Sequence, residues 1–254
     1  ETSISADGEY LVACADNSTT GYLYFFKSSS STPVWKKEHD DLNSCAISAD
    51  GEKIILYSND DRKIYLYDKS GDEIWSYNTS GGSGPQTQSY LQLSDDGNYI
   101  ISFTEYSGSA ADKLRLFSTK SNVPLWTNSS ISSSCGHGDS RFSSDGEYFL
   151  MRCTNYNAYF FGKDSSSALW TFNTGTGGNT IQAMDISADG EKIAIHAGNK
   201  LYMLGKGSNS PLWTATTPSD SVMSMSKDGL YVALASISTP SYRMELYSTS
   251  NSTE

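Results

Sequence analysis

Four cysteines are the side chains of this chain best suited to covalent chemistry: Cys14, Cys45, Cys135 and Cys153. Their even number allows two disulfides. Cys135 and Cys153 flank a turn at residues 145–146, so they could face each other across neighbouring strands. Cys14 and Cys45 fall near one rim of adjacent repeat units. We therefore predict Cys135–Cys153 and Cys14–Cys45 disulfides, with buried free thiols as the alternative.

The histidines and acidic side chains form no recognisable catalytic or metal-binding pattern. His39, His137 and His196 are isolated, and no Cys-x-x-Cys or His-x-x-x-His spacing predicts zinc. Neither a Gly-x-Ser-x-Gly nucleophile motif nor a phosphate-binding loop ending in Gly-Lys-Ser/Thr occurs. Of the few acidic residues outside turns, Glu105 and Asp139 are the pair to inspect for glycoside hydrolysis. We predict no enzymatic activity, no cofactor and no metal.

Four asparagines lie in the Asn-x-Ser/Thr pattern of N-glycosylation acceptors: Asn17, Asn78, Asn128 and Asn251. Serine and threonine make up about a quarter of the chain, so chance alone would give about this number. Asn17, Asn78 and Asn128 fall in predicted loops on one face of the fold, which sugars there would coat. We predict these asparagines as glycosylation sites, on the condition that the protein is secreted.

Charge and composition exclude two classes of partner. The 254 residues carry a formal net charge of −11, and the sequence pI is about 4.7. No basic stripe could neutralise phosphates, so we predict no nucleic-acid partner. No apolar run is long enough to span a membrane.

The abundance of serine and threonine, with a strand pattern that begins directly at Glu1, favours a mature or trimmed fragment of an extracellular or cell-surface protein.

One short motif recurs along the chain and sets its period. Ser-x-Asp-Gly, in which Asp bonds nearby backbone and Gly accepts positive φ, is typical of a hairpin turn. It begins at Ser5, Ser48, Ser94, Ser143, Ser187 and Ser226, in steps of 43, 46, 49, 44 and 39 residues. Residues 44–77 show four short apolar runs around such a turn, which predicts four antiparallel strands per unit. The predicted units span residues 1–38, 39–77, 78–128, 129–172, 173–215 and 216–254.

The middle strands of these units are apolar on both faces. All five side chains of residues 22–26, Tyr-Leu-Tyr-Phe-Phe, are large, whereas a strand with one wet face would alternate apolar with polar residues. Four-stranded sheets that stack face to face around an axis make a β-propeller. We therefore predict one all-β domain over residues 1–254. It is a β-propeller of six four-stranded units with an incomplete last unit, or part of a seven-bladed propeller.

One tryptophan closes each of the first five units: Trp35, Trp75, Trp126, Trp170 and Trp213. Because the residue recurs once per unit at the same place, we predict that these rings pack between blades. A ligand-binding box of tryptophans is the alternative.

The repeats resemble two known propeller families. The Ser-x-Asp-Gly-(Glu/Asn)-(Tyr/Lys) turn resembles WD40-like repeats, and residues 64–75, Ile-Tyr-Leu-Tyr-Asp-Lys-Ser-Gly-Asp-Glu-Ile-Trp, resemble the PQQ-like, quinoprotein-type repeat. The resemblance covers nearly the whole chain and implies a propeller fold of the kind found in prokaryotic, often archaeal, surface proteins. Quinoprotein activity is not implied, because no vicinal cysteine pair is present to line a quinone site.

The sixth unit stops after residues 243–247 without a tryptophan strand. Three explanations remain open: flanking sequence completes it, it stays three-stranded, or another molecule donates a strand. We expect a non-enzymatic extracellular structural or interaction module that self-associates into a glycosylated fibre by strand complementation. The alternative is a propeller that binds or hydrolyses a small ligand or carbohydrate. It would use the central pocket or the face with the long loops, at residues 78–89, 104–112, 128–139 and 236–242.

Overall fold

The computed structural model is built from β-strands in the part of the chain that it describes. These are residues 1–16, 20–39, 41–79, 86–106, 112–131, 135, 140–153, 156–175, 180–219, 221–236 and 242–251, with backbone alone for residues 86–89 and 106. No helix among them is long and apolar enough to cross a membrane. The predicted all-β class is confirmed.

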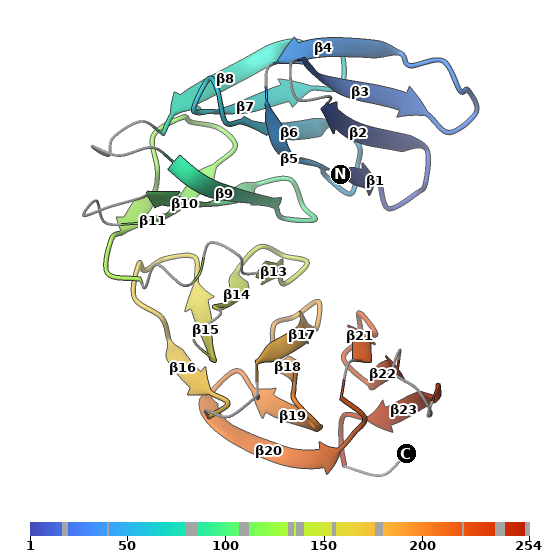
Figure 1. The fold of residues 1–254 in the computed structure, drawn as a ribbon, viewed down its shortest axis with the longest axis vertical. Helices are drawn as coiled ribbons and strands as arrows, with labels where there is room; N and C mark the ends of the chain where they lie inside the picture. Colours follow the sequence, from blue (N-terminus) through green and yellow to red (C-terminus); the bar gives the residue numbers. More distant parts are fainter. Residues whose placement is uncertain are drawn as a thin grey trace. The chain divides into compact units, whose positions relative to one another are not determined.

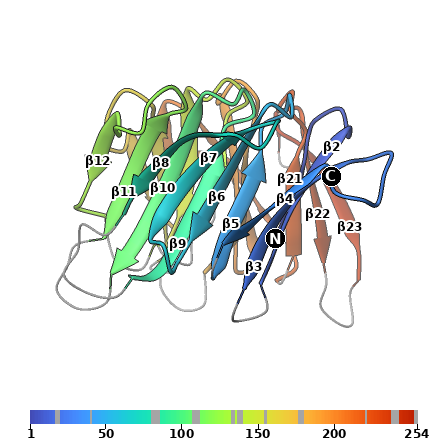
Figure 2. The same ribbon diagram turned by 90° about the horizontal axis from the view of Figure 1, so that it is seen from above.

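The chain divides into two compact units, and the first, Glu1–Gly136, contains three antiparallel sheets, which we call blades. Its strands are β1 (Thr2–Ile4), β2 (Tyr10–Asp16), β3 (Gly21–Lys27), β4 (Trp35–His39), β5 (Leu42–Ile47), β6 (Lys53–Ser58), β7 (Lys63–Asp68), β8 (Glu73–Asn78), β9 (Gln86–Leu93), β10 (Tyr99–Tyr106), β11 (Lys113–Ser118) and β12 (Trp126–Asn128). Blade 1 is β1–β4, blade 2 is β5–β8 and blade 3 is β9–β12, each hydrogen-bonded in chain order. Blade 2 lies between blades 1 and 3 (Figures 1 and 2).

The second unit, His137–Glu254, contains the other three blades. Its strands are β13 (Ser140–Phe142), β14 (Tyr148–Arg152), β15 (Asn157–Gly162), β16 (Trp170–Asn173), β17 (Ile181–Ile186), β18 (Lys192–Ala197), β19 (Lys200–Gly205), β20 (Ser208–Thr216), β21 (Ser221–Met225), β22 (Tyr231–Ser236) and β23 (Met244–Ser248). Blades 4 and 5 have four strands, whereas blade 6 has only β21, β22 and β23 in the described chain (Figure 1). The fold is therefore a series of propeller-type four-stranded units with an incomplete last one, as predicted.

The Ser-x-Asp-Gly turns join the first two strands of each blade through one hydrogen-bond pattern. In blade 2, the Ser48 hydroxyl donates to Asp50 Oδ1 at 2.5 Å, and the same oxygen accepts the Glu52 N–H at 3.0 Å. Gly51 closes the turn with a φ of 72°, a left-handed conformation that glycine adopts without strain. The Asp oxygen is thus occupied by turn contacts, which explains why this residue recurs without marking a metal site.

These turns also connect neighbouring blades. The second residue of a turn donates its backbone N–H to the carbonyl oxygen of the second residue of the next turn, at 2.8–3.0 Å. The pairs are Ala6 with Ala49, Ala49 with Asp95, Ser144 with Ala188, and Ala188 with Lys227. Because the bonds use only backbone atoms, the x position of the motif is free to vary.

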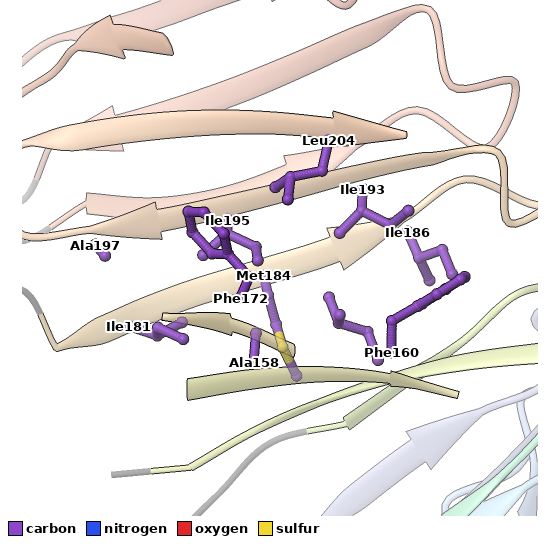
Figure 3. Close-up of a cluster of buried hydrophobic side chains, with 11 residues drawn as sticks. Ala158, Phe160, Phe172, Ile181, Met184, Ile186, Ile193, Ile195, Ala197 and Leu204 are labelled. Carbon is purple, nitrogen blue, oxygen red and sulfur yellow. The ribbon is translucent and has the colours of Figure 1, made fainter. Parts of the chain in front are cut away.

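The core lies between blades rather than inside one sheet. Residues 54–57, Ile-Ile-Leu-Tyr, are all fully buried, because Ile54 and Leu56 pack toward blade 1 whereas Ile55 and Tyr57 pack toward blade 3. Figure 3 shows the corresponding cluster between blades 4 and 5. We call the side of a blade that faces the preceding blade its leading face, and the other side its trailing face.

Two turn glycines provide a matched test of blade packing. Gly51 and Gly8 have nearly the same φ, so alanine at either should cost about 1–2 kcal/mol of backbone strain. At Gly51 the added Cβ would also lie 2.8 Å from the ring of Tyr10 in blade 1, whereas at Gly8 it meets nothing within 4 Å. We expect Gly51→Ala to lower the unfolding free energy by a further 1–3 kcal/mol or so. Urea denaturation of both variants measures this difference, and equal losses would contradict it.

Candidate functional site

The five tryptophans lie on the fourth strands of blades 1–5: Trp35, Trp126 and Trp170 begin β4, β12 and β16, whereas Trp75 and Trp213 lie within β8 and β20. Four of them donate the indole Nε1–H to a backbone carbonyl oxygen of the next blade at 2.8–2.9 Å: Trp35 to Lys69, Trp75 to Thr119, Trp170 to Lys206 and Trp213 to Thr249. Trp126 lies on β12. Buried indole groups need such a partner. The contacts of these four donors place their rings at blade junctions rather than in an open binding box.

A series of stacked aromatic rings connects Trp35 with Tyr10, the first residue of β2 after the Ser-x-Asp-Gly turn of blade 1. Tyr10 stacks on Phe25 with centroids 5.4 Å apart, and Phe25 stacks on Trp35 at 5.1 Å. Lys69 of blade 2 holds its ammonium group 4.1 Å above the Tyr10 ring. The second unit repeats the arrangement with Tyr148, Phe160, Trp170 and Lys206. A cation over a ring stabilises a fold by about 0.5–1 kcal/mol at exposed sites. These contacts therefore stabilise the packing of neighbouring blades.

The cysteines are all oxidised. Cys14 on β2 and Cys45 on β5 form a disulfide that joins blades 1 and 2. Cys135 and Cys153 are also disulfide-bonded, and both are buried. No cysteine in the chain is a free thiol. The cysteines therefore have no thiolate for catalysis or metal binding.

Three of the four sequon asparagines lie in the described part of the chain. Asn78 and Asn128 are the last residues of β8 and β12, the fourth strands of adjacent blades, which places both at the same rim of the first unit. Asn251 is exposed after β23. Asn17 lies outside the described residues.

The other predicted residues do not assemble a catalytic site among the described side chains. His196 is fully buried, with Nε2 3.0 Å from the Thr217 hydroxyl and 3.2 Å from the Pro218 carbonyl oxygen. Glu105 lies half-buried on β10, whereas its proposed partner Asp139 and His137 lie outside the described residues. Most of the long-loop segments lie outside them too. Within the described chain, no group of three His, Cys, Asp or Glu side chains could hold a metal.

One polar cluster connects blades 1 and 2 and was not visible in the sequence. His39 ends β4, and its Nε2 lies 2.8 Å from the Tyr67 hydroxyl while Nδ1 lies 3.4 Å from Asp61 Oδ2. The Tyr65 hydroxyl donates to the same Asp61 oxygen at 2.7 Å. This geometry suits the tautomer whose Nδ1–H donates to Asp61 and whose Nε2 accepts the Tyr67 proton.

The electrostatics of this cluster favour a structural role. Burial, followed by the hydrogen bond to Asp61, raises the pKa of Tyr65 far above its usual value. Burial and the nearby carboxylates raise the pKa of Tyr67 similarly. Although burial opposes it, hydrogen bonding from Tyr65 and His39 lowers the pKa of Asp61. Both tyrosines therefore stay protonated, so neither hydroxyl is an activated nucleophile.

Blade 6 has a trailing face whose apolar side chains are exposed in the described part of the chain. In blades 1–5, the third-strand residue that pairs with the tryptophan is at most 1% exposed: Phe25, Leu66, Leu116, Phe160 and Met203. Leu246 occupies this position on β23. It lies three residues before Thr249, which accepts the Trp213 indole N–H, just as Leu66 lies three residues before Lys69, which accepts that of Trp35. It is 54% exposed, and Met244 on the same face is 78% exposed.

No family model matches the chain, and no curated protein matches it. The candidate functional site is the incomplete sixth blade, whose third strand exposes apolar residues in the described chain.

Proposed function

We propose that the chain is a non-enzymatic structural or interaction module of the cell exterior that self-associates through its incomplete sixth blade. In this proposal, a strand from a second copy adds to β23, and repetition of the contact produces a fibre. A WD40-like or PQQ-like origin of the repeats, as their sequence pattern suggests, is consistent with such a role.

The proposal is supported by β23, an edge strand with exposed apolar side chains. It is the last strand of a three-stranded sheet in which the positions buried elsewhere, Met244 and Leu246, are exposed. A strand at the edge of a sheet presents unpaired backbone groups that can accept another strand. Exposed apolar side chains on the same strand add a hydrophobic contribution to the free energy of that pairing.

An extracellular location is supported by cysteine chemistry. All four cysteines are disulfide-bonded, and disulfides persist mainly in oxidising compartments. Asn78 and Asn251 are exposed and lie in sequons, so both are suited to carry glycans in a secreted chain.

Electron microscopy of unfixed native material tests the proposal directly. We expect filaments with an axial repeat close to one copy of the chain, which shorten on dilution as a reversible assembly should. Light scattering across a hundredfold range of concentration provides the matching solution measurement. Discrete monomers at every concentration would contradict self-association and direct attention to a soluble ligand instead.

A further inference from the structure

Every blade junction inside the two units uses the same two positions. The first is the third-strand residue that pairs with the tryptophan, on the trailing face. The second is the residue directly before the turn serine, on the leading face of the next blade. The two share a core cluster in four junctions: Phe25 with Ile47, Leu66 with Leu93, Phe160 with Ile186, and Met203 with Met225.

Two residues at these positions are exposed and share no such cluster among the described residues. Leu246 is the trailing-face residue of blade 6, and Ile4 is the leading-face residue of blade 1. Ile4 is 58% exposed, whereas Ile47, Leu93 and Ile186 at its position are 6–7% exposed. Blades 1 and 6 therefore present two different apolar faces that correspond to the two halves of one junction.

The two faces also differ in the size of their side chains, so that one can fit against the other. On blade 6, Ala233 and Ala235 replace the Ile55 and Tyr57 of blade 2, and with Met244 they line an open groove. On blade 1, the side chains around Ile4 that line a second open groove include Leu11 and Phe26. Small residues on one face leave room for the larger apolar residues of the other.

We infer that the trailing face of blade 6 docks on the leading face of blade 1 of a second copy of this chain. The inference rests on the proposed self-association and specifies its contact surface: two blades stack face to face, with Leu246 of one copy against Ile4 of the next. Because the two faces differ, the contact is heterologous, so each copy uses both faces and the assembly is head-to-tail.

A mixing experiment with two charged variants tests this contact. Leu246→Glu blocks the blade 6 face, and Ile4→Glu blocks the blade 1 face. Both residues are more than half exposed, so the substitutions leave the core intact. We expect each variant alone to sediment as a monomer in analytical ultracentrifugation. An equimolar mixture should shift to twice the monomer mass and stop there, because only one pairing of faces remains.

Leu212→Glu is the matched control, since Leu212 is 56% exposed on the outer strand of blade 5. We expect this variant to assemble like wild type. If Ile4→Glu also assembles like wild type, the face-to-face contact is wrong, while strand addition at β23 survives. If wild type stays monomeric at every concentration and Leu246→Glu only unfolds more easily, the face is covered within one molecule. That result would overturn both the docking and the proposed function.

Discussion

Replacing Trp75 with alanine is expected to lower the free energy of unfolding by about 3–5 kcal/mol. The ring is buried at the junction of blades 2 and 3, where its centroid lies 5.8 Å from that of Phe117. Its Nε1–H donates to the Thr119 carbonyl oxygen at 2.8 Å in a buried hydrogen bond. Alanine would leave a cavity and an unsatisfied carbonyl group. Urea denaturation followed by far-ultraviolet circular dichroism measures the loss without relying on tryptophan fluorescence.

The adjacent Ile74 supplies the control for this prediction. It precedes Trp75 on the same strand but is half-exposed, so Ile74→Ala should change stability by no more than about 1 kcal/mol. Similar losses in the two variants would argue that Trp75 is not a packing residue. A Trp75→Phe variant should recover part of the loss, because it fills most of the cavity but cannot donate the hydrogen bond.

Removing the disulfide between blades 1 and 2 is the second large expected effect. The bond joins residues 31 apart in sequence, and a loop of this length contributes about 3–4 kcal/mol by restricting the unfolded chain. We therefore expect the double variant Cys14→Ala, Cys45→Ala to lose this amount in urea denaturation under non-reducing conditions. Alanine keeps both positions small and apolar, so the change in packing is limited.

The other two cysteines serve as the internal control. Mass spectrometry without reduction should show that Cys135 and Cys153 remain oxidised in the double variant, so that any loss belongs to the first bond alone. A double variant as stable as wild type would show that the Cys14–Cys45 bond does not hold the two blades together in solution.

The fold could be predicted because each blade repeats its own local signals. Ser-x-Asp-Gly marks a turn through contacts within five residues, as the Ser48 and Asp50 hydrogen bonds show. The large apolar residues on both faces of residues 22–26 and 54–57 indicate sheets covered on both sides. The absence of a sixth tryptophan strand likewise predicted that blade 6 would be incomplete. None of these inferences needs knowledge of which residues meet across a junction.

The candidate sites were harder to predict, because they depend on contacts between blades. In the sequence His39 is an isolated histidine, and its partners Asp61 and Tyr67 belong to the next repeat. A histidine at the end of a tryptophan strand, followed by alternating tyrosines in the next unit, is the only signal that could have indicated the cluster. Ile4 is similar: its residue type matches Ile47, and only the structure shows that one is exposed and the other buried.

The shared geometry of the junctions also has an evolutionary consequence. Because the four junctions inside the two units pair the same trailing and leading positions, as Phe25 pairs with Ile47 and Met203 with Met225, blades 2 and 5 each carry both halves of a compatible contact. A gene duplication that inserts one repeat would thus create two new junctions without requiring a compensating substitution in its neighbours. The length of such an array can change by whole repeats while its packing chemistry stays the same, which is how a family of longer and shorter relatives would arise from one ancestral blade.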